Sequence, residues 1–126
     1  MTDPEITDAE YRVMQVLWAQ SPLTAVEIAD RLSSTTGWGL TTVKTLISRL
    51  CEKNALTHQR DGRRFLYAPA LSHANHASKK TRDLVDRLFG GRAAPLVAHL
   101  ANHKDGLSPS DIEELEALLE ELKSDD

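Results

Sequence analysis

The pair Asp61-Gly62 stands between two short runs of β-compatible apolar and aromatic residues, 56–59 and 64–67. An Asp-Gly pair flanked by such runs is a strong indicator of a tight two-residue β-hairpin. The residues before it have helical rather than strand periodicity. The fold must therefore place a hairpin directly behind a set of helices.

Three segments before the hairpin have the features of short amphipathic helices. Thr7–Glu10 and Thr24–Glu27 are capping boxes that start the first two helices, and Ser21-Pro22 ends the first. The third helix begins near Thr41 and closes at Lys53-Asn54, where the asparagine suits a left-handed cap. Apolar residues at helical spacing predict the buried faces: Tyr11, Met14, Leu17, Trp18, Ala25, Ile28, Ala29, Leu32, Val43, Leu46, Ile47 and Leu50.

Helix, helix, helix and hairpin, separated by short turns, are the elements of a winged helix-turn-helix, in which the hairpin is the wing. A generic α+β domain is the alternative that has the same elements. The tight spacing favours the winged fold, and we assign it to residues 1–70 as a DNA-binding domain.

Residues 71–126 are predicted to be fully helical, so the chain is mostly α with a small β-hairpin wing. Ser72 caps a helix that runs to Gly90-Gly91, a shorter helix covers Ala94–Asn102, and Ser108-Pro109 starts the last one. This segment is too small for an independent core, so a partner subunit must cover its apolar stripes. We predict a three-helix dimerisation domain with these contact residues: Leu84, Leu88, Leu96, Leu100, Ile112, Leu115, Leu119 and Leu122.

The net charge of −4 hides an uneven distribution along the chain. Residues 40–92 have a balance of +7, whereas residues 1–39 carry −4 and residues 93–126 carry −7. Phosphate attraction depends on the local charge, because salt screens charges more than about 8–10 Å apart. The basic middle segment fits nucleic-acid binding, although a solvated charged face is an equally good explanation of charge alone.

The third helix carries the candidate DNA-reading residues, because the second helix of a helix-turn-helix motif lies in the major groove. Its outward side carries hydroxyl and basic side chains: Thr41, Thr42, Lys44, Thr45, Ser48 and Arg49. Threonine can contact base edges and the thymine methyl, arginine can bind guanine, and lysine more often holds phosphate. A solvated polar face is the alternative, but three threonines lower helix propensity with no gain in packing.

Three arginines, Arg60, Arg63 and Arg64, surround the hairpin turn. Arginines at such a turn usually lie along the sugar-phosphate backbone or in the minor groove. A basic hairpin beside a polar helix is more specific than either feature alone. Together they predict double-stranded DNA as the partner.

Enzymatic and metal chemistry have little support in the sequence. His73 and His76 are three residues apart and His99 and His103 four apart, so each pair could share a helix face, but no further ligand motif accompanies them. We therefore predict surface histidines, no metal and no cofactor. Cys51 is predicted to be a semi-buried thiol, with redox sensing as the alternative. The sequence has no phosphate loop, nucleophile elbow or paired catalytic carboxylates, so we predict that the protein is not an enzyme.

The expected compartment is the cytoplasm. No apolar run approaches the roughly 18–20 residues that cross a bilayer, so membrane insertion is not expected. The acidic N-terminus lacks the features of a secretory signal, and a single cysteine cannot form an intrachain disulfide.

Three stretches of the chain resemble the penicillinase-repressor family of BlaI and MecI. They are ITDAEYRVMQVLW, GLTTVKTLISRLCEKNALTHQRDGRRFLYAP and LSPSDIEELEALLEEL. The likeness spans Ile6 to about Leu122, and the middle stretch is its most specific part.

The resemblance implies a homodimer that binds a palindromic operator and dimerises through its three C-terminal helices. In antibiotic-responsive members of the family, a membrane sensor-protease system triggers repressor cleavage at an Asn-Phe pair in the dimerisation domain. The aligned pair here is His99-Leu100, which is the possible cleavage site. Copper-responsive relatives carry a C-terminal Cys-x-Cys pattern, which this chain lacks.

Two classes of function follow from the sequence. The first is a sequence-specific transcriptional repressor, and the second is a winged-helix protein-interaction module that does not bind DNA. The basic wing and the threonine-rich and arginine-bearing helix face favour the repressor, because an interaction module would not need them.

Overall fold

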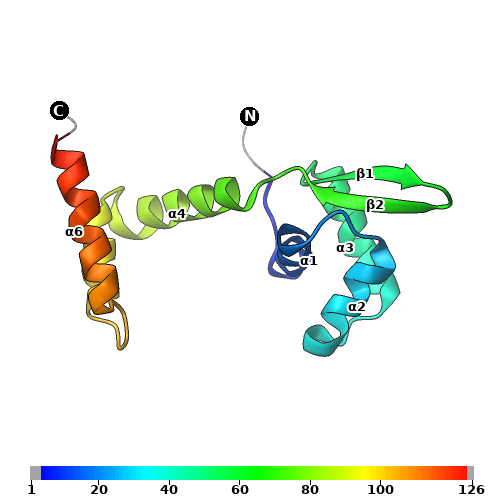
Figure 1. The fold of residues 1–126 in the computed structure, drawn as a ribbon, viewed down its shortest axis with the longest axis horizontal. Helices are drawn as coiled ribbons and strands as arrows, with labels where there is room; N and C mark the ends of the chain where they lie inside the picture. Colours follow the sequence, from blue (N-terminus) through cyan, green and yellow to red (C-terminus); the bar gives the residue numbers. More distant parts are fainter. Residues whose placement is uncertain (1–3, 125–126) are drawn as a thin grey trace. The chain divides into compact units, whose positions relative to one another are not determined.

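The computed structural model describes residues 4–124, which form six helices and one antiparallel two-stranded sheet. The elements, in chain order, are α1 (Asp8–Ala19), α2 (Ala25–Thr36), α3 (Leu40–Glu52), β1 (Leu56–Asp61), β2 (Arg64–Pro69), α4 (His73–Phe89), α5 (Ala93–Ala101) and α6 (Pro109–Ser124). They divide into two units, Met1–Lys79 and Lys80–Asp126, and α4 runs through the boundary. Figure 1 shows α1, α2 and α3 gathered beside the hairpin in the first unit. The predicted mostly helical fold with a hairpin wing is confirmed.

Both predicted capping boxes are present. The backbone N–H of Thr7 donates to Glu10 Oε1 at 2.9 Å, and the N–H of Glu10 donates to Thr7 Oγ1 at 3.1 Å. Thr24 and Glu27 repeat the arrangement at the start of α2. At the end of α3, Asn54 has a φ of +63°, which confirms the left-handed cap.

The core of the first unit comes from one face of each helix. Val43, Leu46, Ile47 and Leu50 of α3 are buried, as their helical spacing predicts. They pack with buried residues of α1, α2, β1 and the connecting segments: Ile6, Val13, Met14, Leu17, Leu23, Ile28, Ala29, Leu32, Ala55, Leu56 and Leu71. Burying this stripe of α3 leaves the opposite side of the helix in solvent.

The hairpin register pairs Leu56 with Pro69 and Asp61 with Arg64. Each strand extends two residues beyond the C-terminal end of the run that predicted it. Asp61 therefore belongs to β1, and the two turn residues are Gly62 and Arg63. Gly62 has a φ of +65°, a conformation that glycine adopts without steric cost. Leu23 also pairs with Tyr67 through two backbone hydrogen bonds of 2.8 and 3.1 Å, which ties the α1–α2 loop to the wing. The sequence analysis did not predict this bridge.

The start of α4 packs against α1 within the first unit. Trp18 Nε1 donates to the carbonyl oxygen of Leu71 at 2.9 Å. His76 is buried, with its ring centroid 5.5 Å from that of Tyr11 and 5.6 Å from that of Trp18. The prediction of surface histidines is therefore wrong for His76, because its helix face is covered by the aromatic side chains of α1.

The second unit has helices but no buried core of its own. Ser108 caps α6 in a reciprocal pair of hydrogen bonds with Asp111, at 3.0 and 3.1 Å, and Pro109 is the first helical residue, as predicted. Among the described residues from Lys80 to Ser124, none is buried. Large apolar side chains are instead exposed: Leu84, Leu88, Val97, Leu100, Ile112, Leu118, Leu119 and Leu122. Within residues 4–124, no helix is long and apolar enough to cross a membrane.

Candidate nucleic-acid interface

The outward face of α3 carries all six polar residues that the sequence singled out. Thr41, Thr42, Lys44, Thr45, Ser48 and Arg49 are exposed. The hydroxyl of Thr45 donates to the carbonyl oxygen of Thr41 at 3.1 Å, as threonines inside helices often do. This bond uses the hydroxyl hydrogen and leaves the Thr45 methyl group and the acceptor lone pairs of its oxygen available to a partner.

The three wing arginines lie in different environments, although all are exposed. Arg60 Nε donates to the Gly62 carbonyl at 3.0 Å, and its guanidinium lies 5.8 Å from the centre of the Phe65 ring. Arg64 forms an ion pair with Asp61, with Nη2 3.1 Å from Oδ2. Arg63 has no ion pair within the described part of the chain. The guanidinium of Arg60 is therefore restrained, that of Arg64 is neutralised by Asp61, and that of Arg63 carries an uncompensated charge.

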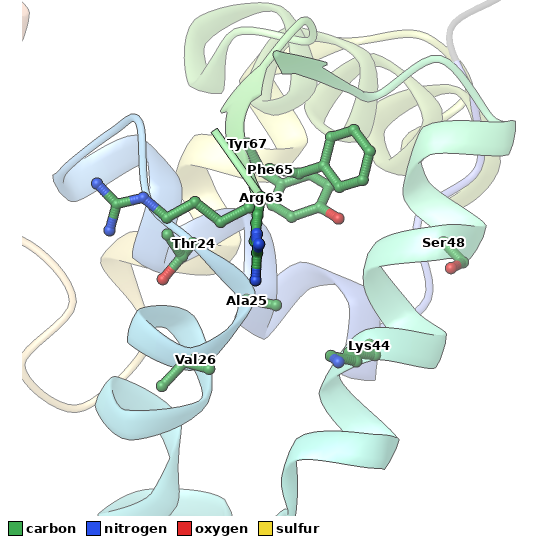
Figure 2. Close-up of a pocket in the computed structure, with 9 residues that line it drawn as sticks. Thr24, Ala25, Val26, Lys44, Ser48, Arg63, Phe65 and Tyr67 are labelled. Atoms are coloured by element: carbon green, nitrogen blue, oxygen red, sulfur yellow. The ribbon is translucent and has the colours of Figure 1, made fainter. Parts of the chain in front are cut away.

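A groove of about 370 Å³ lies between α3 and the wing. It is bounded by the start of α2, the middle of α3 and the beginning of β2, and its lining residues are Thr24, Ala25, Val26, Lys44, Ser48, Arg63, Arg64, Phe65 and Tyr67. In Figure 2, Lys44 lies on α3 facing α2 across this space, and Phe65 and Tyr67 extend from the strand. The groove brings together four of the predicted site residues, two from α3 and two from the wing. The other five predicted residues do not line it.

Two apolar residues of this groove were missed by the sequence analysis. Val26 is 53% exposed in the first turn of α2, and Phe65 is 42% exposed on β2. His58 packs edge-on against the Phe65 ring, with 5.3 Å between the ring centroids, and the Arg60 guanidinium lies over the same ring. The register that pairs Arg60 with Phe65 contains this information, since cross-strand partners share a face of the sheet.

An acidic residue, Glu27, directly follows the three groove-lining residues at the start of α2. Hydrogen bonds from Thr24 hold the pKa of Glu27 below its ordinary value, and Arg31 and Arg64 act in the same direction. Glu27 therefore stays ionised as part of its capping box. The uncompensated positive charge comes from Lys44 and Arg63, neither of which has an ion pair among the described residues.

A second hollow of about 300 Å³ lies on the other side of Phe65, between α3 and the sheet. Cys51 lines it, half-buried as predicted, and burial raises the pKa of its thiol. A raised pKa lowers the fraction of reactive thiolate, so this environment does not favour redox sensing. No group of three or more potential metal-ligand side chains lies together within residues 4–124.

Comparison with known proteins places this interface in a family. The profile of the penicillinase repressor family matches residues 6–121. The penicillinase repressor of Bacillus licheniformis is 35% identical over 121 residues, which cover 96% of this chain and 94% of that protein.

Two solved structures match the fold at 38% sequence identity. In each case the match covers 59% of this chain and 90% of the chain in the solved structure. One is the DNA-binding domain of the repressor BlaI, with a TM-score of 0.54. The other is the monomeric form of Bacillus licheniformis BlaI in complex with the blaP half-operator, with a TM-score of 0.52. These matches confirm the resemblance found in the sequence, and the chain belongs to the penicillinase repressor family.

Proposed function

We propose that this protein is a transcriptional repressor that binds duplex DNA through α3 and the wing. The observation that carries the proposal is the groove in which Lys44 and Ser48 of α3 meet Arg63 and Arg64 of the hairpin. Basic and hydroxyl side chains that meet in this way suit a sugar-phosphate backbone that passes between two recognition elements. BlaI, whose DNA-binding domain has this fold, is a repressor that binds a half-operator.

In this proposal α3 reads bases and the wing holds the backbone. Thr41, Thr42, Thr45 and Arg49 lie outside the groove on the exposed side of α3, where a major-groove helix meets base edges. Lys44 and Arg63 contact phosphates because their charge is uncompensated. Phe65 and Val26 add apolar surface that fits the deoxyribose carbons of the same strand.

We further propose a homodimer on a palindromic operator, with residues 1–70 binding DNA and residues 71–126 forming the dimer. The exposed leucines of α4, α5 and α6 support this division, since a surface so rich in apolar side chains is typical of an interaction site. The two partly covered candidates, Leu96 and Leu115, belong to the same apolar set. Two-fold symmetry then places each wing and α3 on one half-site.

The proposal also covers how the repressor is inactivated and in which cellular compartment it acts. Inactivation through a membrane sensor-protease system would act on His99-Leu100, which lies in the last turn of α5 with both side chains exposed. Helix ends fray, so this bond can become accessible without unfolding the rest of the unit. A repressor of this class acts where the chromosome is, in the cytoplasm.

The test is binding of the purified full chain to the duplex upstream of its own gene, against a shuffled duplex of equal length. If a dimer makes on the order of 6–10 phosphate contacts, affinity should fall about 10³–10⁵-fold between 50 and 200 mM salt. A protected palindrome in footprinting would locate the operator. An affinity for DNA that does not change with salt would favour the protein-interaction module instead.

A further inference from the structure

Four charged side chains connect α1, the end of α3, the N-terminal segment and α4 within the first unit. Lys53 Nζ lies 2.5 Å from Glu10 Oε1 and also donates to the backbone carbonyl of Glu5 at 2.8 Å. The side chain of Glu5 accepts from Lys79 Nζ at 3.0 Å. We call this set, Glu10–Lys53–Glu5–Lys79, the ionic link.

Glu10 is the fixed end of the ionic link. Its side chain is only 1% exposed, and Oε1 accepts both from the Thr7 backbone N–H and from Lys53. A buried carboxylate is retained only with hydrogen-bonding or charged partners, because burial otherwise disfavours its ionised form. The same carboxylate therefore caps α1 and anchors Lys53.

Lys53 is the C-cap residue of α3, so its ion pair with Glu10 holds the C-terminal end of α3 against α1. Its backbone N–H donates to the carbonyl of Arg49, which lies on the DNA-reading face. The positions of Arg49 and Lys53 are thus coupled through one helical turn. A displacement of Lys53 relative to α1 would move the C-terminal part of that face.

Glu5 connects Lys53 to α4. Its backbone carbonyl holds Lys53, and its side chain pairs with Lys79. Helix α4 continues beyond Lys79 into the second unit. The Glu5–Lys79 pair is exposed on the Glu5 side, at 76%, so it is the weak member of the link and the member most easily broken.

We infer that the ionic link positions α3 for sequence reading and makes that position depend on α4. Glu10 and Lys53 are positioning residues that act through Arg49, and Glu5 and Lys79 transmit the placement of the first turns of α4. The inference rests on the proposed function, because it concerns how the same interface discriminates between DNA sequences.

The test compares two substitutions in the full chain: Glu5→Gln, which removes a negative charge, and Lys79→Gln, which removes a positive charge. Each removes the same link, so each should lower the ratio of operator to shuffled-duplex affinity, by up to about fivefold for an exposed pair. The double variant should lose no more than either single one. General electrostatics instead predicts that Glu5→Gln strengthens and Lys79→Gln weakens binding to both duplexes, with an unchanged ratio.

Asp8→Asn, at the start of α1 close to Glu5 in the chain, and Arg82→Gln, on α4 like Lys79, are the matched charge controls and should leave the ratio unchanged. Lys53→Met should lower the ratio more than either link variant, and Lys53→Arg should restore it. Ratios equal to the wild-type value in both Glu5→Gln and Lys79→Gln, or ratios that move in opposite directions, would overturn the inference. A wild-type ratio of one would instead contradict the proposed function itself, so the two failures are distinguishable.

Discussion

Arg64 and Asp61 are register partners at the end of the wing and form an ion pair, with Nη2 3.1 Å from Oδ2. The neighbouring turn residue, Arg63, has no such partner within residues 4–124. Asp61 therefore reduces the positive charge that the wing offers to a phosphate. In the proposed function, a wing with this ion pair has a weaker attraction to DNA of any sequence, and α3 is the element that discriminates between sequences.

Replacing this carboxylate should strengthen non-specific binding. Asp61→Asn removes one negative charge and releases Arg64, so the protein should gain about one phosphate contact per subunit. The slope of log affinity against log salt should then steepen by about 0.9 per added contact. Fluorescence anisotropy of a shuffled duplex measures this, with Asp30→Asn on α2 as the matched control. A slope that steepens equally in both variants would show that the pairing with Arg64 is irrelevant.

The exposed leucines of α6 should hold the dimer. Leu119 and Leu122 are 54% and 60% exposed in the single chain, so a charge there does not disturb packing within the subunit. Burying one leucine contributes roughly 1.5–3 kcal/mol, and Leu119→Asp should therefore yield a monomer in sedimentation at micromolar concentration.

The same variant should bind the palindrome about a hundredfold more weakly while keeping its affinity for a half-site, since the second binding event is no longer intramolecular. Glu120→Gln is the control on the same helix. A Leu119→Asp protein that remains a dimer would move the interface away from α6.

Stability should depend on pH through Glu10. Burial alone would raise the pKa of Glu10, but hydrogen bonds from Lys53 and Thr7 outweigh it and hold the pKa below its ordinary value. The ionised pair therefore stabilises the fold above the ordinary carboxyl pKa, and this contribution is lost as pH falls through the lowered value.

Lys53→Met leaves the buried carboxylate without its cation and should cost about 3–5 kcal/mol at pH 7. The deficit should shrink toward about pH 3.5, because protonation then removes the unpaired charge. Urea unfolding followed by the intrinsic fluorescence of Trp18 and Trp38 measures both values. A deficit that is the same at both pH values would show that packing of the lysine stem, not its charge, is responsible.

Local sequence rules predicted most of the first unit. The capping boxes at Thr7 and Thr24, the cap at Asn54 and the hairpin each depend on neighbours in the chain, so their residues specify them. The exposed face of α3 followed from its buried stripe, since a helix with one apolar side has the other side in solvent.

The features that were not predicted join residues far apart in the sequence. The bridge between Leu23 and Tyr67, the burial of His76 and the pairing of Glu10 with Lys53 depend on how the helices pack. Glu10 was identified as a capping residue, and nothing local showed that its carboxylate would be buried. The apolar and aromatic pattern of residues 64–67 predicts a strand, but it does not show that the Phe65 side chain is exposed beside α3.

The most direct test of the division between α3 and the wing is the effect of Arg49→Ala and Arg63→Ala on two duplexes, the operator and its shuffled sequence, at one salt concentration. Arg49→Ala should cost about 1–3 kcal/mol on the operator and little on the shuffled duplex. Arg63→Ala should weaken both by the same factor and reduce the salt slope by about one. Equal losses on both duplexes for Arg49→Ala would contradict the assignment of α3 as the helix that reads bases.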